Sequence, residues 1–210
     1  MKLTSATKAL IINTGSANAG TGDRGIEDAE SICEAVANSL EVSPDKVLPF
    51  STGVIMLPLP VEKIKKAVPN LVNGLKDNNW LQAAEAIMTT DTLPKAVSKS
   101  ILIQNQKIII TGISKGAGMI HPNMATMLAF ISTNVNISLK MLQKLNKEVT
   151  DTTFNCISVD GDTSTNDAFI ITTSNQSKNS KIDNADVNYQ LLKSAIFDIA
   201  LELSQSIIRD

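Results

Sequence analysis

Short apolar runs rich in β-branched residues alternate along this sequence with longer stretches whose apolar residues recur at helical spacing. Each of these elements has an apolar face that must be buried against another element. The order therefore predicts an α/β fold (α+β layered) in which helices cover sheets. The expected extended segments are residues 9–13, 47–57, 96–113, 127–131, 157–159 and 169–171, and the expected helices are residues 26–40, 61–68, 80–88, 139–149 and 192–207.

The stretch 96–113 carries the clearest local signal. Its β-branched residues flank the polar tetrapeptide QNQK at 104–107, a pattern typical of a β-hairpin. The polar stretch 174–184 is interpreted as a loop rather than a linker, so residues 1–210 are expected to form one region. The last helical pattern reaches residue 210 without a capping glycine or a polar tail, so we expect the chain to be cut short there.

Composition narrows the classes of function. With 43% hydrophobic and 19% charged residues, the sequence has the composition of a soluble globular protein. Its 19 basic and 21 acidic residues form no basic stripe, so no nucleic-acid partner is expected. No apolar run reaches the roughly 18 residues that span a bilayer, and the N-terminus lacks the apolar stretch of a signal peptide. We therefore expect no membrane partner and a cytoplasmic location.

Residue types that bind metals are scarce in this sequence. Cys33 and Cys156 lie far apart in apolar surroundings, where buried reduced thiols are expected. The single histidine, His121, cannot build a metal site alone and is expected to be a surface or packed residue. No metal is predicted.

Four polar, glycine-rich stretches lie at the ends of expected strands, where loops commonly carry function. Residues 13–22 can form a flexible turn, or their glycines can bring backbone amides close to a ligand. In the second stretch, STGVI at 51–55, the Thr52 hydroxyl and the Gly53 amide can both donate to one oxygen, as an oxyanion hole does. A hydroxyl that caps a turn is the alternative.

The third stretch, residues 114–126, places a Gly-x-Gly pattern beside Lys115. It lacks the residue order and the following helix of a phosphate-binding P-loop. The stretch ends at Thr126, and a threonine hydroxyl becomes an effective nucleophile when a base such as its own N-terminal amine lies beside it. An internal threonine gains that amine only after the backbone is cut.

The fourth stretch, residues 160–167, has three carboxylates within eight residues. This density invites comparison with calcium loops, but the calcium-loop spacing and its distant glutamate are absent. Side chains that hydrogen-bond the backbone of their own loop are the expected alternative.

Six sequence blocks, in this order, resemble the ornithine acetyltransferase family of arginine biosynthesis, also called glutamate N-acetyltransferase. The blocks are NTGSANA at 13–19, STGVI at 51–55, AIMTTDT at 86–92, KGAGMI at 115–120, NMATML at 123–128 and VDGDTSTND at 159–167. The resemblance implies a self-cleaving fold with an N-terminal threonine nucleophile. Family members also carry residues before this segment and continue after it with a GEGATK block that supplies a substrate-binding glutamate. Residues 1–210 would thus be one incomplete catalytic region.

The resemblance implies that the precursor cuts itself between Ala125 and Thr126, into chains that hold residues 1–125 and 126–210. Thr126 would then take the acetyl group from N-acetylornithine, release ornithine, and pass the group to glutamate to form N-acetylglutamate. No cofactor is implied, and the use of acetyl-coenzyme A as a second donor is left open. The cleaved chains would pair as a heterotetramer with two copies of each.

The same resemblance assigns the remaining site residues. Thr52 and Gly53 would stabilise the oxyanion, and Thr89, Lys115 and Thr126 would contact substrate. Lys115 suits this role because its ammonium can pair with the carboxylate of an amino-acid substrate. The loop at 160–167 would support the site. Two alternatives stay open, namely a self-cleaving aminopeptidase-like hydrolase and a truncated homologue without activity.

Overall fold

The computed structural model of this protein describes residues 7–121 and 127–210, and the chain divides into two compact units, Met1–Asn79 and Trp80–Asp210. The sequence predicted one region without a linker, so this boundary is a finding of the structure. Each unit contains its own sheet with helices packed beside it, which confirms the predicted mixture of helices and sheets.

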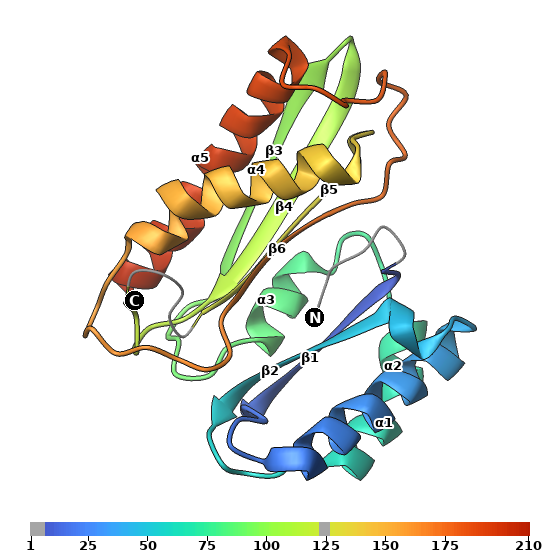
Figure 1. The fold of residues 1–210 in the computed structure, drawn as a ribbon, viewed down its shortest axis with the longest axis vertical. Coiled ribbons are helices and arrows are strands. Elements are labelled where there is room, and N and C mark those ends of the chain that lie inside the picture. Colours follow the sequence, from blue (N-terminus) through green and yellow to red (C-terminus); the bar gives the residue numbers. More distant parts are fainter. Residues whose placement is uncertain (1–6, 122–126) are drawn as a thin grey trace. The chain divides into compact units, whose positions relative to one another are not determined.

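The first unit is a β–α–β arrangement with one further helix (Figure 1). Its strands lie parallel, and the helix between them forms the crossover that parallel strands require. The two helices pack against each other, and Cys33 and Val36 of the first helix lie in the buried core. The elements are β1 (Ala9–Ser16), α1 (Gly22–Leu40), the 3₁₀ turn η1 (Pro44–Lys46), β2 (Val47–Val54) and α2 (Val61–Asn73).

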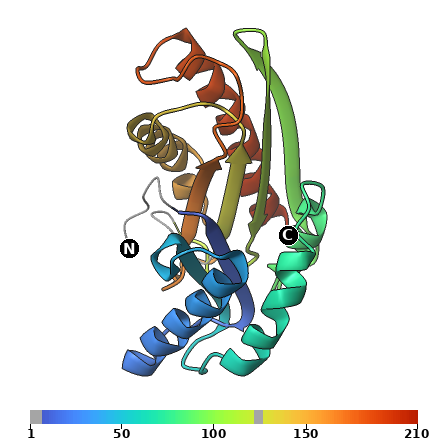
Figure 2. The ribbon, with the colours of Figure 1, turned by 90° about the vertical axis from the view of Figure 1, so that its right-hand side faces the viewer.

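The second unit contains a four-stranded sheet in the order β3-β4-β5-β6 (Figures 1 and 2). The strands are β3 (Lys95–Ile103), β4 (Gln106–Lys115), β5 (Leu128–Thr133) and β6 (Ala168–Thr173). The first three are antiparallel neighbours, whereas β6 runs parallel to β5. The helical elements are α3 (Trp80–Ala86), α4 (Leu139–Thr152), the 3₁₀ turn η2 (Phe154–Cys156) and α5 (Val187–Arg209). None of the helices in residues 7–121 and 127–210 is long and apolar enough to cross a membrane.

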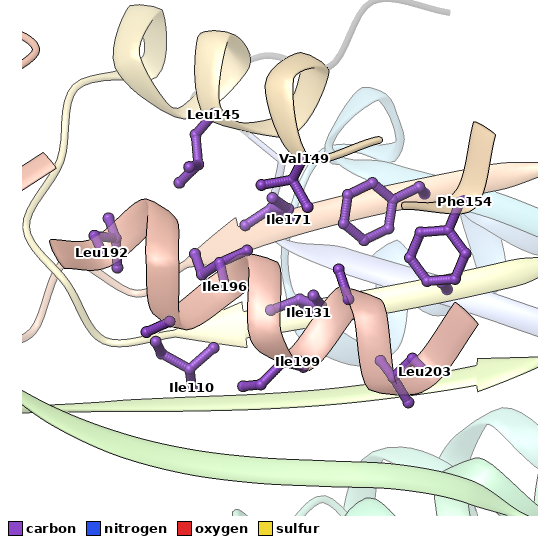
Figure 3. Packing of buried hydrophobic residues seen from close by; sticks show 14 of the residues in the cluster. Ile110, Ile131, Leu145, Val149, Phe154, Ile171, Leu192, Ile196, Ile199 and Leu203 are labelled. Atoms are coloured by element: carbon purple, nitrogen blue, oxygen red, sulfur yellow. The ribbon is translucent and has the colours of Figure 1, made fainter. Parts of the chain in front are cut away.

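Helices α4 and α5 cover one face of this sheet with a continuous apolar core. Figure 3 shows side chains of both helices directed at isoleucines of β4, β5 and β6. Helix α5 approaches β4 closely because the residue beneath it is Gly112. A Cβ added at Gly112 would stand 2.8 Å from a methyl carbon of Leu203 and 3.0 Å from side-chain carbons of Ile131 and Ile199.

The predicted hairpin is confirmed. Strands β3 and β4 pair from Lys95 opposite Ser114 to Ile103 opposite Gln106. Gln104 and Asn105 form the turn with φ values of 51° and 60°. Two consecutive positive φ values are typical of the tight turn whose twist matches the strands on either side.

The strand expected at residues 157–159 is wrong. This segment follows η2 and belongs to a loop, in which the Val159 N–H and the Ser158 hydroxyl both donate to the Ile120 carbonyl. Ile157 is buried, so its apolar character anchors the loop rather than a sheet. Both cysteines are free as expected, but only Cys33 is buried, whereas Cys156 is exposed.

We expect Gly112→Ala and Leu203→Ala to destabilise the second unit through opposite packing defects. The first overpacks the contact and is expected to cost about 1–3 kcal/mol. The second leaves a cavity and is expected to cost about 2–5 kcal/mol. Because the added methyl group fills part of that cavity, the double variant should be less destabilised than the sum by roughly 1 kcal/mol. Urea unfolding followed by Trp80 fluorescence measures this, and strictly additive losses would contradict the contact.

Candidate functional site

One edge of the four-stranded sheet gathers the strand ends that lead into the stretches at 114–126 and 160–167, two of the four predicted functional stretches. Lys115, the last residue of β4, lies opposite Leu128, the first residue of β5. Leu128 in turn lies opposite Ala168, the first residue of β6. Lys95, the first residue of β3, pairs with Ser114 at the same edge. The stretches rich in Gly, Asp and Thr therefore open from a common edge of the sheet.

Lys115 and Thr89, two of the three predicted substrate contacts, lie side by side at that edge. The Lys115 ammonium donates a hydrogen bond of 2.6 Å to the Thr89 hydroxyl, and the lysine side chain is only 3% exposed. Burial lowers the pKa of Lys115, and the nearby Lys95 lowers it further, whereas Asp91 and Asp167 act to raise it. The result is a desolvated ammonium beside a hydroxyl, which is suited to bind a small anionic group.

A buried carboxylate, Asp91, lies beneath these two residues. One of its oxygens accepts hydrogen bonds from the Gly116 N–H at 2.6 Å and from the Lys95 ammonium at 2.8 Å. The other accepts the Thr89 N–H at 3.1 Å and lies 4.0 Å from the Lys115 nitrogen. Burial alone would raise the pKa of Asp91, but the bonds from Gly116, Lys95 and Thr89 outweigh it and lower that pKa below its usual value.

A second carboxylate, Asp210, pairs with the other side of Lys95. The Lys95 ammonium contacts the Asp210 side chain directly, and the Thr92 N–H also donates to it. The Asp210 pKa is lowered to about 2: burial would raise it, but the bonds from Lys95 and Thr92 dominate. The side chains of Lys95 and Asp210 are each 3% exposed, so this is a buried ion pair rather than a surface one.

The aspartate-rich loop at 160–167 binds backbone amides on both sides of residues 122–126. Asp160 accepts hydrogen bonds from the N–H groups of Met119 at 2.6 Å and Ile120 at 2.9 Å, and these bonds lower its pKa. Asp167 accepts the Met127 N–H at 2.9 Å, although burial raises its pKa overall. These contacts match the expected role of side chains that bond to backbone, and the calcium alternative gains no support from the described loop.

Thr52 and Gly53 lie near the end of β2 in the first unit. Thr52 is 4% exposed and lies opposite Thr14 of β1, while Gly53 lies opposite Gly15. Gly53 has a φ of 134°, and a Cβ added there would stand 2.4–2.7 Å from three backbone atoms of Gly15. Only glycine fits this position, because both the backbone conformation and the close approach of β1 exclude a side chain.

The stretch 13–22 forms hydrogen bonds with the end of β2 and with α1. The Ser51 hydroxyl donates to the Asn13 side chain at 2.6 Å, and the backbone N–H groups of Ala17 and Met56 complete contacts between this stretch and the end of β2. The Asn18 side-chain amide donates to the Gly25 carbonyl at 2.9 Å. These contacts favour a defined loop over a flexible turn.

Within each unit, the structure places predicted site residues close together. Thr89 and Lys115 are in direct contact, and Thr52 and Gly53 are adjacent in the first unit. Ala125 and Thr126 lie outside the described residues. Sequence reasoning missed the charged residues beneath Lys115, namely Asp91, Lys95 and Asp210. The sequence pointed to Asp91, since this residue belongs to the block at 86–92, but no motif contains Lys95 or Asp210.

The whole chain matches one family model. The model is described as the ArgJ family, and the match covers residues 1–210. The arginine biosynthesis bifunctional protein ArgJ of Neisseria gonorrhoeae is 51% identical over 205 residues, which cover 97% of this chain and 50% of that protein. The protein of the same name from Colwellia psychrerythraea is 47% identical over 207 residues, which cover 98% of this chain and 49% of that protein. The chain thus spans about half the length of the curated relatives it matches.

A solved structure shares part of the fold. The crystal structure of the arginine biosynthesis bifunctional protein ArgJ from Bacillus halodurans aligns with a TM-score of 0.50 and 36% sequence identity. The alignment covers 55% of this chain and 61% of that one.

We expect Gly53→Ala to destabilise the β1–β2 pair more than the matched change Gly15→Ala. Gly15 also has a positive φ, 99°, but a Cβ added there meets no atom within 4 Å. Gly15→Ala is therefore expected to cost only the backbone strain, about 1–3 kcal/mol. Gly53→Ala adds a clash with backbone that cannot rotate away. Amide hydrogen exchange in β1 and β2 measures both, and equal protection in the two variants would contradict the close approach of the strands.

Proposed function

This chain belongs to the ArgJ family, and we propose that it forms part of an acetyltransferase that moves the acetyl group of N2-acetyl-L-ornithine to L-glutamate. The observation that carries the proposal is the contact between Thr89 and Lys115. These residues stand 26 positions apart, and the family resemblance assigns both to substrate binding. Their meeting places a buried ammonium beside a hydroxyl, two donors that support a site for an amino-acid carboxylate.

In the proposed reaction, the backbone is first cut between Ala125 and Thr126, which gives Thr126 a free amine. This amine accepts the proton of the Thr126 hydroxyl as its oxygen attacks the acetyl carbonyl of N-acetylornithine. The tetrahedral intermediate collapses, the C–N bond breaks, and ornithine leaves with the proton. The amine of glutamate then attacks the acetyl-threonine ester, and N-acetylglutamate leaves as the threonine hydroxyl is restored. No redox or electrophilic cofactor is needed, because the threonine oxygen carries the acetyl group.

Thr52 and Gly53 are proposed to stabilise the negative charge that develops on the acetyl oxygen. A hydroxyl and a backbone N–H are suitable donors, and each such donor commonly contributes ~3 kcal/mol to the transition state. Their setting supports this role, since Thr52 is buried and the packing of Gly53 against Gly15 fixes the backbone. Fixed donors act without reorganisation during the reaction.

Lys115 and Thr89 are proposed to bind the α-carboxylate that acetylornithine and glutamate share. A buried ammonium pairs more strongly with an anion than an exposed one does, because water screens it less. The same contact can serve both half-reactions, since the two amino acids occupy the site in turn. We further propose that the cleaved chains assemble as two copies of each, and that the enzyme works in the cytoplasm, where such metabolites are found.

We expect the full-length product of this gene to be isolated as two chains that divide between Ala125 and Thr126. Thr126→Ala should stay uncut, because alanine has no hydroxyl to attack the preceding carbonyl. Thr111→Ala is the matched control, since the Thr111 hydroxyl contacts Ser98 on β3, away from the predicted bond. Intact-mass measurement distinguishes these outcomes. An uncut wild-type protein would show that the assignment of Thr126 is wrong.

We expect the same preparations to separate the proposed transferase from its alternatives. The wild type should form ornithine and N-acetylglutamate together, and Thr126→Ala should reduce this rate by roughly a thousandfold or more, as loss of a catalytic nucleophile does. Chromatography of both products measures the reaction. Release of amino acids from peptides without acetyl transfer would favour the aminopeptidase-like hydrolase, and no turnover at all would favour the inactive homologue.

We also propose acetyl-coenzyme A as a second acetyl donor, because the curated relatives carry the word bifunctional in their name. The wild type should then release coenzyme A when glutamate is present, and Thr126→Ala should not. A thiol-specific dye measures the release. Transfer from acetylornithine without any release of coenzyme A would show that the enzyme has a single donor.

A further inference from the structure

We propose that Asp91 is a positioning residue of the substrate site, whose buried carboxylate holds Thr89 and Lys115 where both can face the carboxylate of a substrate. The inference deepens the proposed function and rests on it, because Thr89 and Lys115 bind substrate only under that proposal. Asp91 itself is assigned no contact with substrate. Its role is to act through its two neighbours.

The geometry places Asp91 at the junction of three segments. Its carboxylate accepts from the backbone of Thr89 and of Gly116, and from the side chain of Lys95 at the start of β3. Thr89 is thereby fixed at its own amide, and Lys115 is fixed through the residue that follows it. A carboxylate has about four lone-pair directions. Three of them carry hydrogen bonds here, and Lys115 stands 4.0 Å from one oxygen as a charge partner.

An asparagine at this position could not reproduce these contacts. Its side chain has one accepting oxygen and one donating amide nitrogen, whereas both oxygens of Asp91 accept from N–H groups. In Asp91→Asn, the side-chain NH₂ group would therefore face a backbone N–H, so that two donors would oppose each other. The change would also remove a negative charge that lies beside two buried ammonium groups. Leaving a buried donor or charge without its partner is costly, so the segments should shift.

The charges around Lys115 give this role a measurable signature. Three charged residues act on the Lys115 pKa: Asp91 from the segment before β3, Lys95 from β3, and Asp167 from the loop before β6. Asp210 acts indirectly, through its ion pair with Lys95. Asp91 stabilises the protonated form of Lys115, so its loss should lower the Lys115 pKa. Neutral lysine cannot pair with a carboxylate. Substrate binding should therefore fail at a lower pH in Asp91→Asn than in the wild type.

Lys95→Gln should shift the alkaline pH at which substrate binding fails in the opposite direction. Lys95 lowers the pKa of Lys115 by charge repulsion. Removing that positive charge should raise the pKa, so substrate binding should persist to a higher pH. Two variants that both disturb the buried network and yet shift the profile in opposite directions cannot be explained by a general loss of folded protein.

The experiment is steady-state kinetics of the full-length enzyme from about pH 6 to about pH 10, a range that ends near the ordinary lysine pKa of about 10.4. N-acetylornithine is the varied substrate, because its acylated α-nitrogen does not titrate. Asp91→Asn is expected to raise KM severalfold at the alkaline end, because less of Lys115 is protonated there, with a smaller change in kcat. Asp198→Asn is the control, since it removes only the exposed partner of Lys99.

A second measurement tests the proposal apart from turnover. NMR of the ε-carbon of Lys115, assigned with Lys115→Gln in ¹³C-lysine protein, reports its pKa directly, and amide exchange at Thr89 and Gly116 reports their fixation. Asp91→Asn should lower the pKa and speed both amides. An unchanged Lys115 pKa, or a kcat loss with no movement of the pH profile, would overturn the proposal. If the wild type transfers no acetyl group while the NMR changes appear, the proposed function fails, and only the fixation of Thr89 and Lys115 by Asp91 stands.

Discussion

The described part of the second unit depends on the pairing of four buried charged side chains at one edge of its sheet. Lys95 and Lys115 carry the positive charges, and Asp91 and Asp210 balance them, with side chains that are almost completely buried. Burying an isolated charge is strongly unfavourable, so each member needs the others. The loops that hold Thr89 and Gly116 are ordered around this arrangement, because their amides complete the hydrogen bonding of Asp91.

The sheet supplies the frame on which these charges can meet. The end of β4 and the beginnings of β3, β5 and β6 lie at one edge because the first three strands are antiparallel neighbours and the last pair is parallel. Helices α4 and α5 bury the apolar face of the same strands, so this edge is held by a packed core on one side. Interactions that bind substrates benefit from such rigidity, since donors need not be ordered at each turnover.

The sequence predicted the features that rest on local periodicity. The hairpin at β3 and β4 and helices such as α4 follow from the spacing of apolar residues and from the polar turn residues. The prediction of a strand at residues 157–159 was wrong because a short apolar run anchors a buried loop as readily as it forms a strand. Thr89 and Lys115 came from motif blocks, but Lys95 and Asp210 did not, because their contact joins residues 115 positions apart and leaves no mark in local spacing.

The same long-range contact sets an order of events during synthesis. A ribosome makes the chain from its N-terminus, and domains commonly begin to fold as they emerge. Lys95 leaves the ribosome before α5 is made, whereas Asp210 follows α5, so Lys95 gains one of its two acidic partners only after α5 has been made. Assembly of the charged edge therefore waits for α5, which ties maturation of the site to the synthesis of the sheet and its covering helices.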